Sequence, residues 1–109
     1  MLRLCPSPHA VARAKERAGW CRHALARMLE RALYDGLEAA ECGRALRSYL
    51  AAIPAEAHGR FARVYGQHVF IFGKDGTPDT ATLVTVLHLP HELRSAAQRA
   101  RQSRHRQAA

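Results

Sequence analysis

The sequence lacks long hydrophobic runs. Its longest apolar stretches are HVFIF, at residues 68–72, and ATLVTVLHL, at residues 81–89. Both are much shorter than the roughly 18–20 residues that a membrane-spanning helix needs, and the N-terminus has no apolar core of the kind found in signal peptides. We therefore expect no membrane partner and a cytoplasmic location. At 109 residues the chain is long enough for one domain with one core.

Cysteine is scarce and forms no recognisable motif. Cys5, Cys21 and Cys42 are odd in number, lie far apart and include no C-x-x-C pair, which argues against a disulfide framework and against a zinc knuckle. His88 and His91 lack the carboxylate or cysteine pair that would complete a metal site. The chain also has no G-x-x-x-x-G-K-[ST] loop, which argues against nucleotide hydrolysis. We expect no metal, no cofactor, and reduced, partly buried thiols.

Acidic residues are few: nine Asp and Glu stand against 17 Lys and Arg and leave a net charge of +8. All but two of the basic residues are arginine, whose planar guanidinium binds phosphate in a bidentate way and stacks on bases. GC-rich coding also raises the content of Arg and Ala, so composition explains part of this excess. Clustering is harder to explain in that way. The end of the chain, RSAAQRARQSRHRQAA, holds five arginines and no acid: Arg94, Arg99, Arg101, Arg104 and Arg106.

This basic end is predicted to contact nucleic acid. Such a run commonly follows a nucleic-acid backbone or docks on an acidic partner. We assign nucleic-acid binding to Arg99, Arg101, Arg104 and Arg106, together with Arg17 nearer the N-terminus. The alternative, a solvated helix end that frays into disorder, stays open.

Hydrophobic periodicity predicts helices in the N-terminal half. Ser7 and Pro8 are a typical helix start, so a first helix runs over residues 8–18 and stops at Gly19. A second helix over residues 21–34 has the strongest core-facing stripe in the chain. The sequence DGLE at residues 35–38 has the pattern of a capping box and starts a third helix, which ends before Pro54. The segment PAEAHG, at residues 54–59, is expected to be a linker.

From Arg60 the period changes from helical to strand-like. RFARVY and HVFIF, joined by Gly66 and Gln67, predict a hairpin with glycine first in its two-residue turn. A polar loop over residues 73–80 leads to ATLVTVLHL, which is apolar on both faces, as in a central strand. The sequence thus predicts an α+β fold: three N-terminal helices packed on a small antiparallel sheet of about three strands, with a C-terminal helix and a basic tail. We expect a single domain over residues 1–95 and the basic end over residues 96–109.

Helical spacing places His9, Arg13 and Arg17 in one row on the first helix. A histidine beside two guanidinium groups could form the floor of a phosphate-handling site, because histidine exchanges protons near neutral pH and arginine binds two phosphoryl oxygens. The row could also be an ordinary solvated face of a very basic protein. The sequence alone leaves both interpretations open.

The motif HA-x-x-R-x-x-x-R on an N-terminal helix, followed by more helices and a sheet that ends in LVTVLHLP, resembles small bacterial and phage proteins of the RelE, BrnT and EndoU type, in the barnase-like ribonuclease superfamily. The resemblance covers roughly residues 7–95. It implies a compact α+β domain with helices on one face of an antiparallel sheet, and RNA cleavage without a metal by a toxin or effector. By position, the resemblance implies site residues at His9 and Arg13 in the helix motif, at Arg63 and Tyr65 on the first strand, and at Thr85 on the last strand.

Members of that group often hold the acid or base near the last strands or the C-terminus. Here the sequence leaves His9, His68, His88 and His91 as choices for this role. Alternation along the strands places His68 on the same face as the aromatic residues of its strand. This arrangement suits an RNA nucleobase stacked near a phosphate. The alternative is a histidine at the wet edge of the sheet. His88 shares a face with Val84 and Val86 by the same alternation, and a lone histidine among valines is more often packed than catalytic.

Two classes of function follow. Metal-free cleavage of RNA needs a base, an acid and cations around the phosphorane, and we assign catalysis to His9, Arg13, Arg63 and Tyr65. The alternative is a non-enzymatic regulator or inhibitor, encoded by a phage or plasmid, that holds nucleic acid or a bacterial defence complex with its basic surface. A third hypothesis is a member of the superfamily that has kept the fold, has lost the catalytic activity and serves as a partner-binding module. The expected partner is RNA or another nucleic acid, and the sheet edges could pair with an antitoxin or a second copy.

Overall fold

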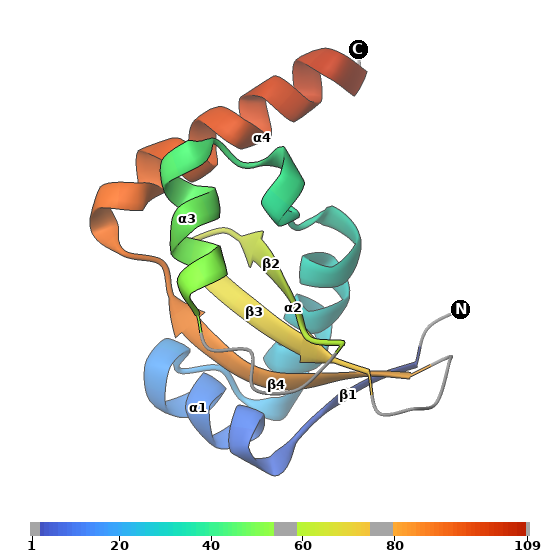
Figure 1. Ribbon diagram of the computed structural model, residues 1–109. Helices are drawn as coiled ribbons and strands as arrows, with labels where there is room; N and C mark the ends of the chain where they lie inside the picture. Colours follow the sequence, from blue (N-terminus) through green and yellow to red (C-terminus); the bar gives the residue numbers. More distant parts are fainter. Residues whose placement is uncertain (1–2, 54–58, 75–79, 109) are drawn as a thin grey trace.

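The computed structural model describes residues 3–53, 59–74 and 80–108, the last four as backbone alone. Within them the chain forms a four-stranded sheet in the order β1-β4-β3-β2, where β1 runs parallel to β4 and the other neighbours are antiparallel (Figure 1). The elements along the chain are β1 (Arg3–Pro6), α1 (Pro8–Ala18), α2 (Arg22–Asp35), a 3-10 turn η1 (Ala39–Glu41), α3 (Arg44–Ala52), β2 (Phe61–Tyr65), β3 (His68–Gly73), β4 (Thr80–His88), a 3-10 turn η2 (His91–Leu93) and α4 (Arg94–Ala108).

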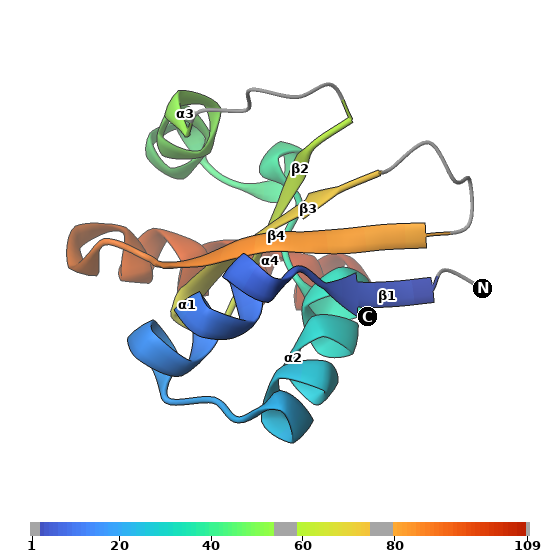
Figure 2. The ribbon, with the colours of Figure 1, turned by 90° about the horizontal axis from the view of Figure 1, so that it is seen from below.

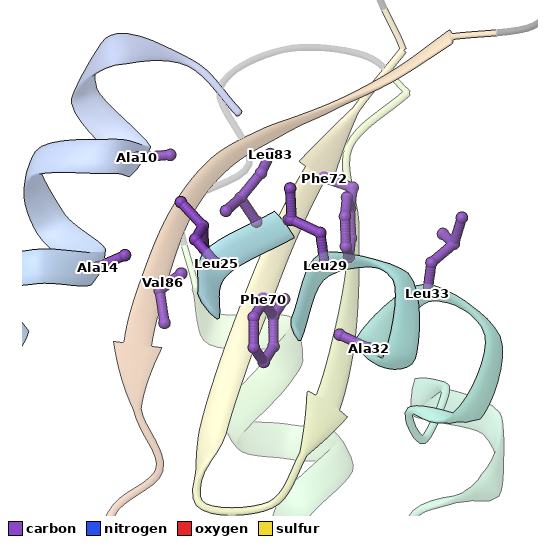
Figure 3. Close-up of a cluster of buried hydrophobic side chains, with 10 residues drawn as sticks. All are labelled: Ala10, Ala14, Leu25, Leu29, Ala32, Leu33, Phe70, Phe72, Leu83 and Val86. Atoms are coloured by element: carbon purple, nitrogen blue, oxygen red, sulfur yellow. The ribbon is translucent and has the colours of Figure 1, made fainter. Parts of the chain in front are cut away.

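Helices cover both faces of the sheet. Figure 2 shows α1 and α2 on one side of the strands and α3 on the other. The first cluster, on the α1 and α2 side, is shown in Figure 3 and consists of Ala10, Ala14, Leu25, Leu29, Ala32, Leu33, Phe70, Phe72, Leu83 and Val86. The second cluster joins the opposite face to α3 and α4 and consists of Leu37, Cys42, Leu46, Leu50, Val64, Val69, Ile71, Leu89, Ala97 and Ala100. The α+β class is confirmed, while the arrangement of helices on one face, implied by the resemblance, is wrong.

Strand β1 was not predicted, and it makes the sheet mixed rather than antiparallel. It pairs from Arg3 with Thr80 to Pro6 with Leu83. Four mostly exposed residues show no alternation of polar and apolar side chains, and their partner lies far along the chain, so local sequence carries little signal for this strand.

The first helix follows its predicted bounds. The hydroxyl of Ser7 accepts a hydrogen bond of 3.0 Å from the amide of Ala10, Pro8 occupies the first turn, and Gly19 ends the helix at φ 71°. Ala10 and Ala14 are fully buried, and their small side chains let α1 pack closely against β4 (Figure 3).

The predicted third helix is divided into two pieces. The capping box lies at Glu38 and Glu41 and starts the 3-10 turn η1, rather than at Asp35. Before it, Leu37 exchanges two backbone hydrogen bonds with Val64, at 2.8 and 3.0 Å, and so covers part of the β2 edge. The tertiary pairing of Leu37 keeps these residues extended where a helix was expected.

The hairpin prediction is confirmed. Gly66 has φ 61° in the two-residue turn between β2 and β3, a conformation for which glycine is best suited. Residues 54–58 of the expected linker and residues 75–79 of the expected polar loop lie outside the described residues.

A β-bulge in β4 changes which side chains share a face. Ile71 pairs with Thr85 and Phe72 with Leu83, so β4 holds one extra residue between them. Val86 consequently packs in the first cluster while Val84 packs against the second. The strict alternation that placed Val84 and Val86 together with His88 on one face is therefore wrong.

The basic end of the chain is helical: α4 runs from Arg94 to Ala108 and buries Ala97 and Ala100 in the second cluster. Among the cysteines, Cys42 is buried, whereas Cys5 and Cys21 are exposed rather than partly buried. No helix within the described residues is long and apolar enough to cross a membrane.

Candidate functional site

The row predicted on α1 has three different environments. His9 is exposed in the first turn of the helix. Arg13 forms a surface ion pair with Glu16 at 2.9 Å, and Arg17 turns toward the sheet, where its Nη1 donates a hydrogen bond of 2.8 Å to the carbonyl oxygen of Val86. The helix aligns the three residues, but its two guanidinium groups have different partners.

Arg63 and Tyr65 lie on the face of β2 that packs toward α2. The guanidinium of Arg63 pairs with Glu38 at 3.1 Å and lies 4.8 Å above the ring of Phe61. Tyr65 is half-buried beside the first cluster and sits opposite His68 in the hairpin. Thr85, which the resemblance carries to the same site, pairs with Ile71 of the second cluster and so lies on the opposite face from Tyr65.

The arginines of α4 divide into exposed and structural ones. Arg99 and Arg101 are exposed and suit the predicted contact with a polyanion. Arg104 instead donates to the backbone oxygens of Asp35, at 2.8 Å, and of Gly36, at 3.3 Å, and pairs with Glu41 at 3.1 Å. The side chain of Arg106 lies outside the described residues.

Two histidines, His68 and His88, lie next to each other at one end of the sheet. His68 is the first residue of β3, His88 is the last of β4, and the two are direct cross-strand partners. Their ring centroids are 5.1 Å apart, with the ring planes inclined at 41°. His68 is half-buried and His88 is exposed, so the pair has one protected and one solvent-facing imidazole.

The hairpin turn holds this pair in place. Only two residues separate Tyr65 at the end of β2 from His68, so the tyrosine and the histidine face each other across the turn. Gln67 in the turn accepts a backbone hydrogen bond of 2.9 Å from Leu89, directly after His88. The end of β4 is thereby tied to the turn, and both histidines are fixed at the same end of the sheet.

Trp20 supplies an aromatic wall next to the pair. It follows Gly19 in the connection between α1 and α2, and its amide donates a hydrogen bond of 3.3 Å to the carbonyl of Ala14. The indole lies 4.7 Å from the ring of His68 and stacks at 5.8 Å on Phe70. The imidazole of His68 therefore has both Trp20 and His88 as ring neighbours.

The electrostatic environment of His68 favours its neutral form. Burial, the neighbouring imidazole of His88 and the charge of Arg94 all lower the pKa of His68 below its ordinary value of 6.5. Arg94 begins α4, and its Nε is buried without a hydrogen-bond partner among the described residues. A buried guanidinium N–H without an acceptor is uncommon.

This arrangement can move protons next to an anion. A neutral imidazole can accept a proton, a second imidazole in contact with it can donate one, and Arg94 adds positive charge. Sequence reasoning named His68 and His88 separately as choices but did not pair them. The turn at Gly66 was a usable signal for the position of His68, whereas the pairing with His88 depends on the register of β4.

The described residues contain no group of three or more His, Cys, Asp or Glu side chains placed to hold a metal ion. Comparisons of the chain with protein families, with curated proteins and with solved structures give no match.

Proposed function

We propose that this protein is a metal-free ribonuclease in which His68 and His88 are the acid–base pair, the activity implied by its resemblance to the barnase-like group. The observation that carries the proposal is the direct contact of the two imidazoles, 5.1 Å apart between centroids, at one end of the sheet. The net charge of +8 supports a polyanionic substrate.

In the proposed reaction, the 2′-oxygen of a ribose attacks the adjacent phosphorus while His68 takes the 2′-hydroxyl proton. The bond from phosphorus to the 5′-oxygen breaks, and His88 in its imidazolium form donates a proton to that leaving oxygen. The products are a 2′,3′-cyclic phosphate and a 5′-hydroxyl. His68 is the base because burial and positive neighbours keep it neutral.

We assign stabilisation of the phosphorane to Arg94, whose charge is felt at His68. The Nε of Arg94 has no partner among the described residues. Positive charge near the equatorial oxygens would stabilise the negative charge that develops on them. Tyr65, across the turn from His68, lines the same end of the sheet.

A specific observation favours the second candidate, a non-enzymatic regulator that binds nucleic acid or an acidic partner. Arg17 and Arg104 donate to backbone carbonyls and Arg63 pairs with Glu38, so these three are occupied by the fold. Arg99 and Arg101 remain exposed on α4. A binder needs only such a surface, whereas a ribonuclease also needs the histidine pair.

The test is incubation of the purified protein with labelled total RNA in EDTA at low salt. Wild type should produce fragments that end in cyclic phosphate, while H88Q and H68N should each lose at least about a hundredfold in rate, since general acid–base groups contribute roughly 10²–10⁴. The double variant H9A/R13A removes the site predicted on α1 and should retain activity. H23Q changes an exposed histidine of α2 and controls for nonspecific effects.

Three other outcomes decide against the proposal. Loss of cleavage in H9A/R13A but not in H88Q would return the site to α1. Intact RNA with binding that weakens as salt rises would favour the regulator. Cleavage abolished by EDTA in the wild type would show that the reaction needs a metal.

A further inference from the structure

An exposed tyrosine between arginines stands out on the outer face of α2. Tyr34 is the large hydrophobic side chain that remains exposed among the described residues, with 51% of its surface accessible. It borders a hollow of about 410 Å³ whose other lining residues are Arg27, Glu30, Arg31 and Asp35. The hollow thus combines an aromatic ring, two guanidinium groups and two carboxylates.

The periodicity of α2 explains why these groups gather. Successive residues of an α-helix are about 100° apart, so Arg27, Arg31 and Tyr34 fall within an arc of about 60°. Leu25 and Leu29 point the other way, into the first cluster (Figure 3). The hollow therefore lies on the side of the helix opposite to the core, where no packing role accounts for the tyrosine.

The charged groups of the hollow are free to bind a ligand. Elsewhere in this protein arginines near glutamates form ion pairs, as Arg13 does with Glu16. Within the described residues Arg27, Arg31 and Glu30 form no ion pair or side-chain hydrogen bond. The backbone oxygen of Asp35 accepts from Arg104, which anchors the end of α4 next to the hollow.

We propose that this hollow binds a guanine nucleotide within single-stranded RNA. A base stacks on the exposed ring of Tyr34, and an adjacent phosphate pairs with Arg27 or Arg31. The carboxylates select guanine, because the Watson–Crick edge of guanine presents two parallel donors, N1–H and the 2-amino group, to a single carboxylate. Adenine, cytosine and uracil lack that pair of donors.

This inference rests on the proposed function for its choice of RNA. It adds that the bound RNA extends beyond the phosphodiester that is cleaved. At about 1.5 Å per residue, the 14 residues of α2 span about 20 Å. Trp20 and the histidine pair lie at the N-terminal end of α2 and the hollow at its C-terminal end. A strand of several nucleotides is needed to reach both.

The experiment measures binding of fluorescent RNA octamers to the full-length H88Q protein by anisotropy, so that cleavage cannot interfere. The octamers differ at one central position, which is guanine, hypoxanthine or abasic, in an otherwise adenine strand. Guanine should bind best, because hypoxanthine lacks the 2-amino group and the abasic position offers no base to the ring of Tyr34. On the H88Q background, Y34A should weaken binding of the guanine octamer about tenfold and Y34F by less than twofold.

Matched variants separate the hollow from general charge. R27Q/R31Q and R44Q/R47Q remove the same number of charges, the latter from exposed positions on α3, so both should reduce nonspecific binding. Only R27Q/R31Q should also lower the preference for guanine over hypoxanthine, and E30Q, which removes one carboxylate charge, should lower it too. Because Tyr34 is exposed, Y34A is expected to fold, and circular dichroism checks this.

Equal binding of the three octamers, or unchanged affinity in Y34A, would overturn the inference. Failure of the proposed ribonuclease activity would look different. In that case wild type leaves RNA intact, while the preference for guanine and the loss in Y34A persist.

Discussion

The guanidinium of Arg17 and the carbonyl oxygen of Val86 are joined by a hydrogen bond of 2.8 Å, between residues on α1 and β4. Strand β1 ends opposite Leu83, so Val86 lies beyond the part of β4 that has a parallel neighbour. Arg17 therefore donates to a carbonyl oxygen of β4 at a position that β1 does not reach. This contact is therefore part of the fold. If Arg17 also binds nucleic acid, as predicted, the same guanidinium group would have to serve both contacts.

Replacing Arg17 with methionine should lower the free energy of unfolding by about 1–2 kcal/mol, because the aliphatic stem is kept but a charged hydrogen bond is lost. Urea denaturation measures the change. R13M removes only the surface ion pair with Glu16 and should change stability by less than about 0.5 kcal/mol. Equal losses in both variants would mean that the contact with Val86 adds nothing.

Stability should depend on pH through His68. Its pKa is lower in the folded protein than its ordinary value of 6.5, so the folded state binds fewer protons than the unfolded state. The resulting stabilisation is fully present above pH 6.5 and is lost progressively as the pH falls toward the folded pKa. His88 and Arg94 are the charged groups that act on this imidazole.

The measurement is the free energy of unfolding by urea between pH 7.5 and pH 5. The H68Q variant lacks the titrating group and should show a smaller decline than wild type over this range. H23Q, which removes an exposed imidazole, should follow wild type. A wild-type profile parallel to that of H68Q would contradict the assignment.

Two glycines that end helices should differ in their tolerance of alanine. At Gly19 the backbone has φ 71° with open space around the missing side chain, so G19A should cost about 1 kcal/mol of backbone strain. At Gly36 an added Cβ would overlap the carbonyl oxygen of Ala32 and lie 3.1 Å from the Cβ of Arg63. We expect G36A to cost about 2–3 kcal/mol, measured by thermal or urea unfolding. A smaller loss in G36A than in G19A would show that the end of α2 can shift away from β2.

Arg104 should control the order of the last turns of α4. Its hydrogen bonds to Asp35 and Gly36 connect this helix to the end of α2. In R104Q, amide hydrogen exchange in the final turns of α4 should become faster while the centre of the sheet stays protected, and stability should fall by about 1 kcal/mol. R99Q, at an exposed position on the same helix, should leave the exchange pattern unchanged.

Features with a short-range cause were predictable from the sequence. Ser7 with Pro8 and Gly19 bound the first helix because capping and the left-handed conformation are properties of a few adjacent residues. Gly66 placed the hairpin turn in the same way. The apolar stripe of α2 also packs in the core as expected, since helical periodicity depends only on spacing along the chain.

The candidate site was predictable only in part. Tyr65 and His68 could be placed on facing strands because two turn residues set the register between them. The pairing of His68 with His88 could not be predicted, because the extra residue in β4 moves the side chains beyond Val84 to the opposite face of the sheet from the one that simple alternation predicts. The hydrogen bonds of Arg17 and Arg104 to backbone carbonyls could not be predicted either, because each acceptor lies 69 residues away along the chain.

The sequence by itself determined the class of fold, the basic character of the protein, the bounds of α1 and the hairpin, because composition, capping and periodicity act over a few residues. The tertiary structure alone decided that β1 joins the sheet, that helices cover both faces, and that His68 meets His88 beside Trp20. Those relationships arise when distant segments compete for the same hydrogen bonds and buried surface, and the outcome of that competition depends on the whole folded chain.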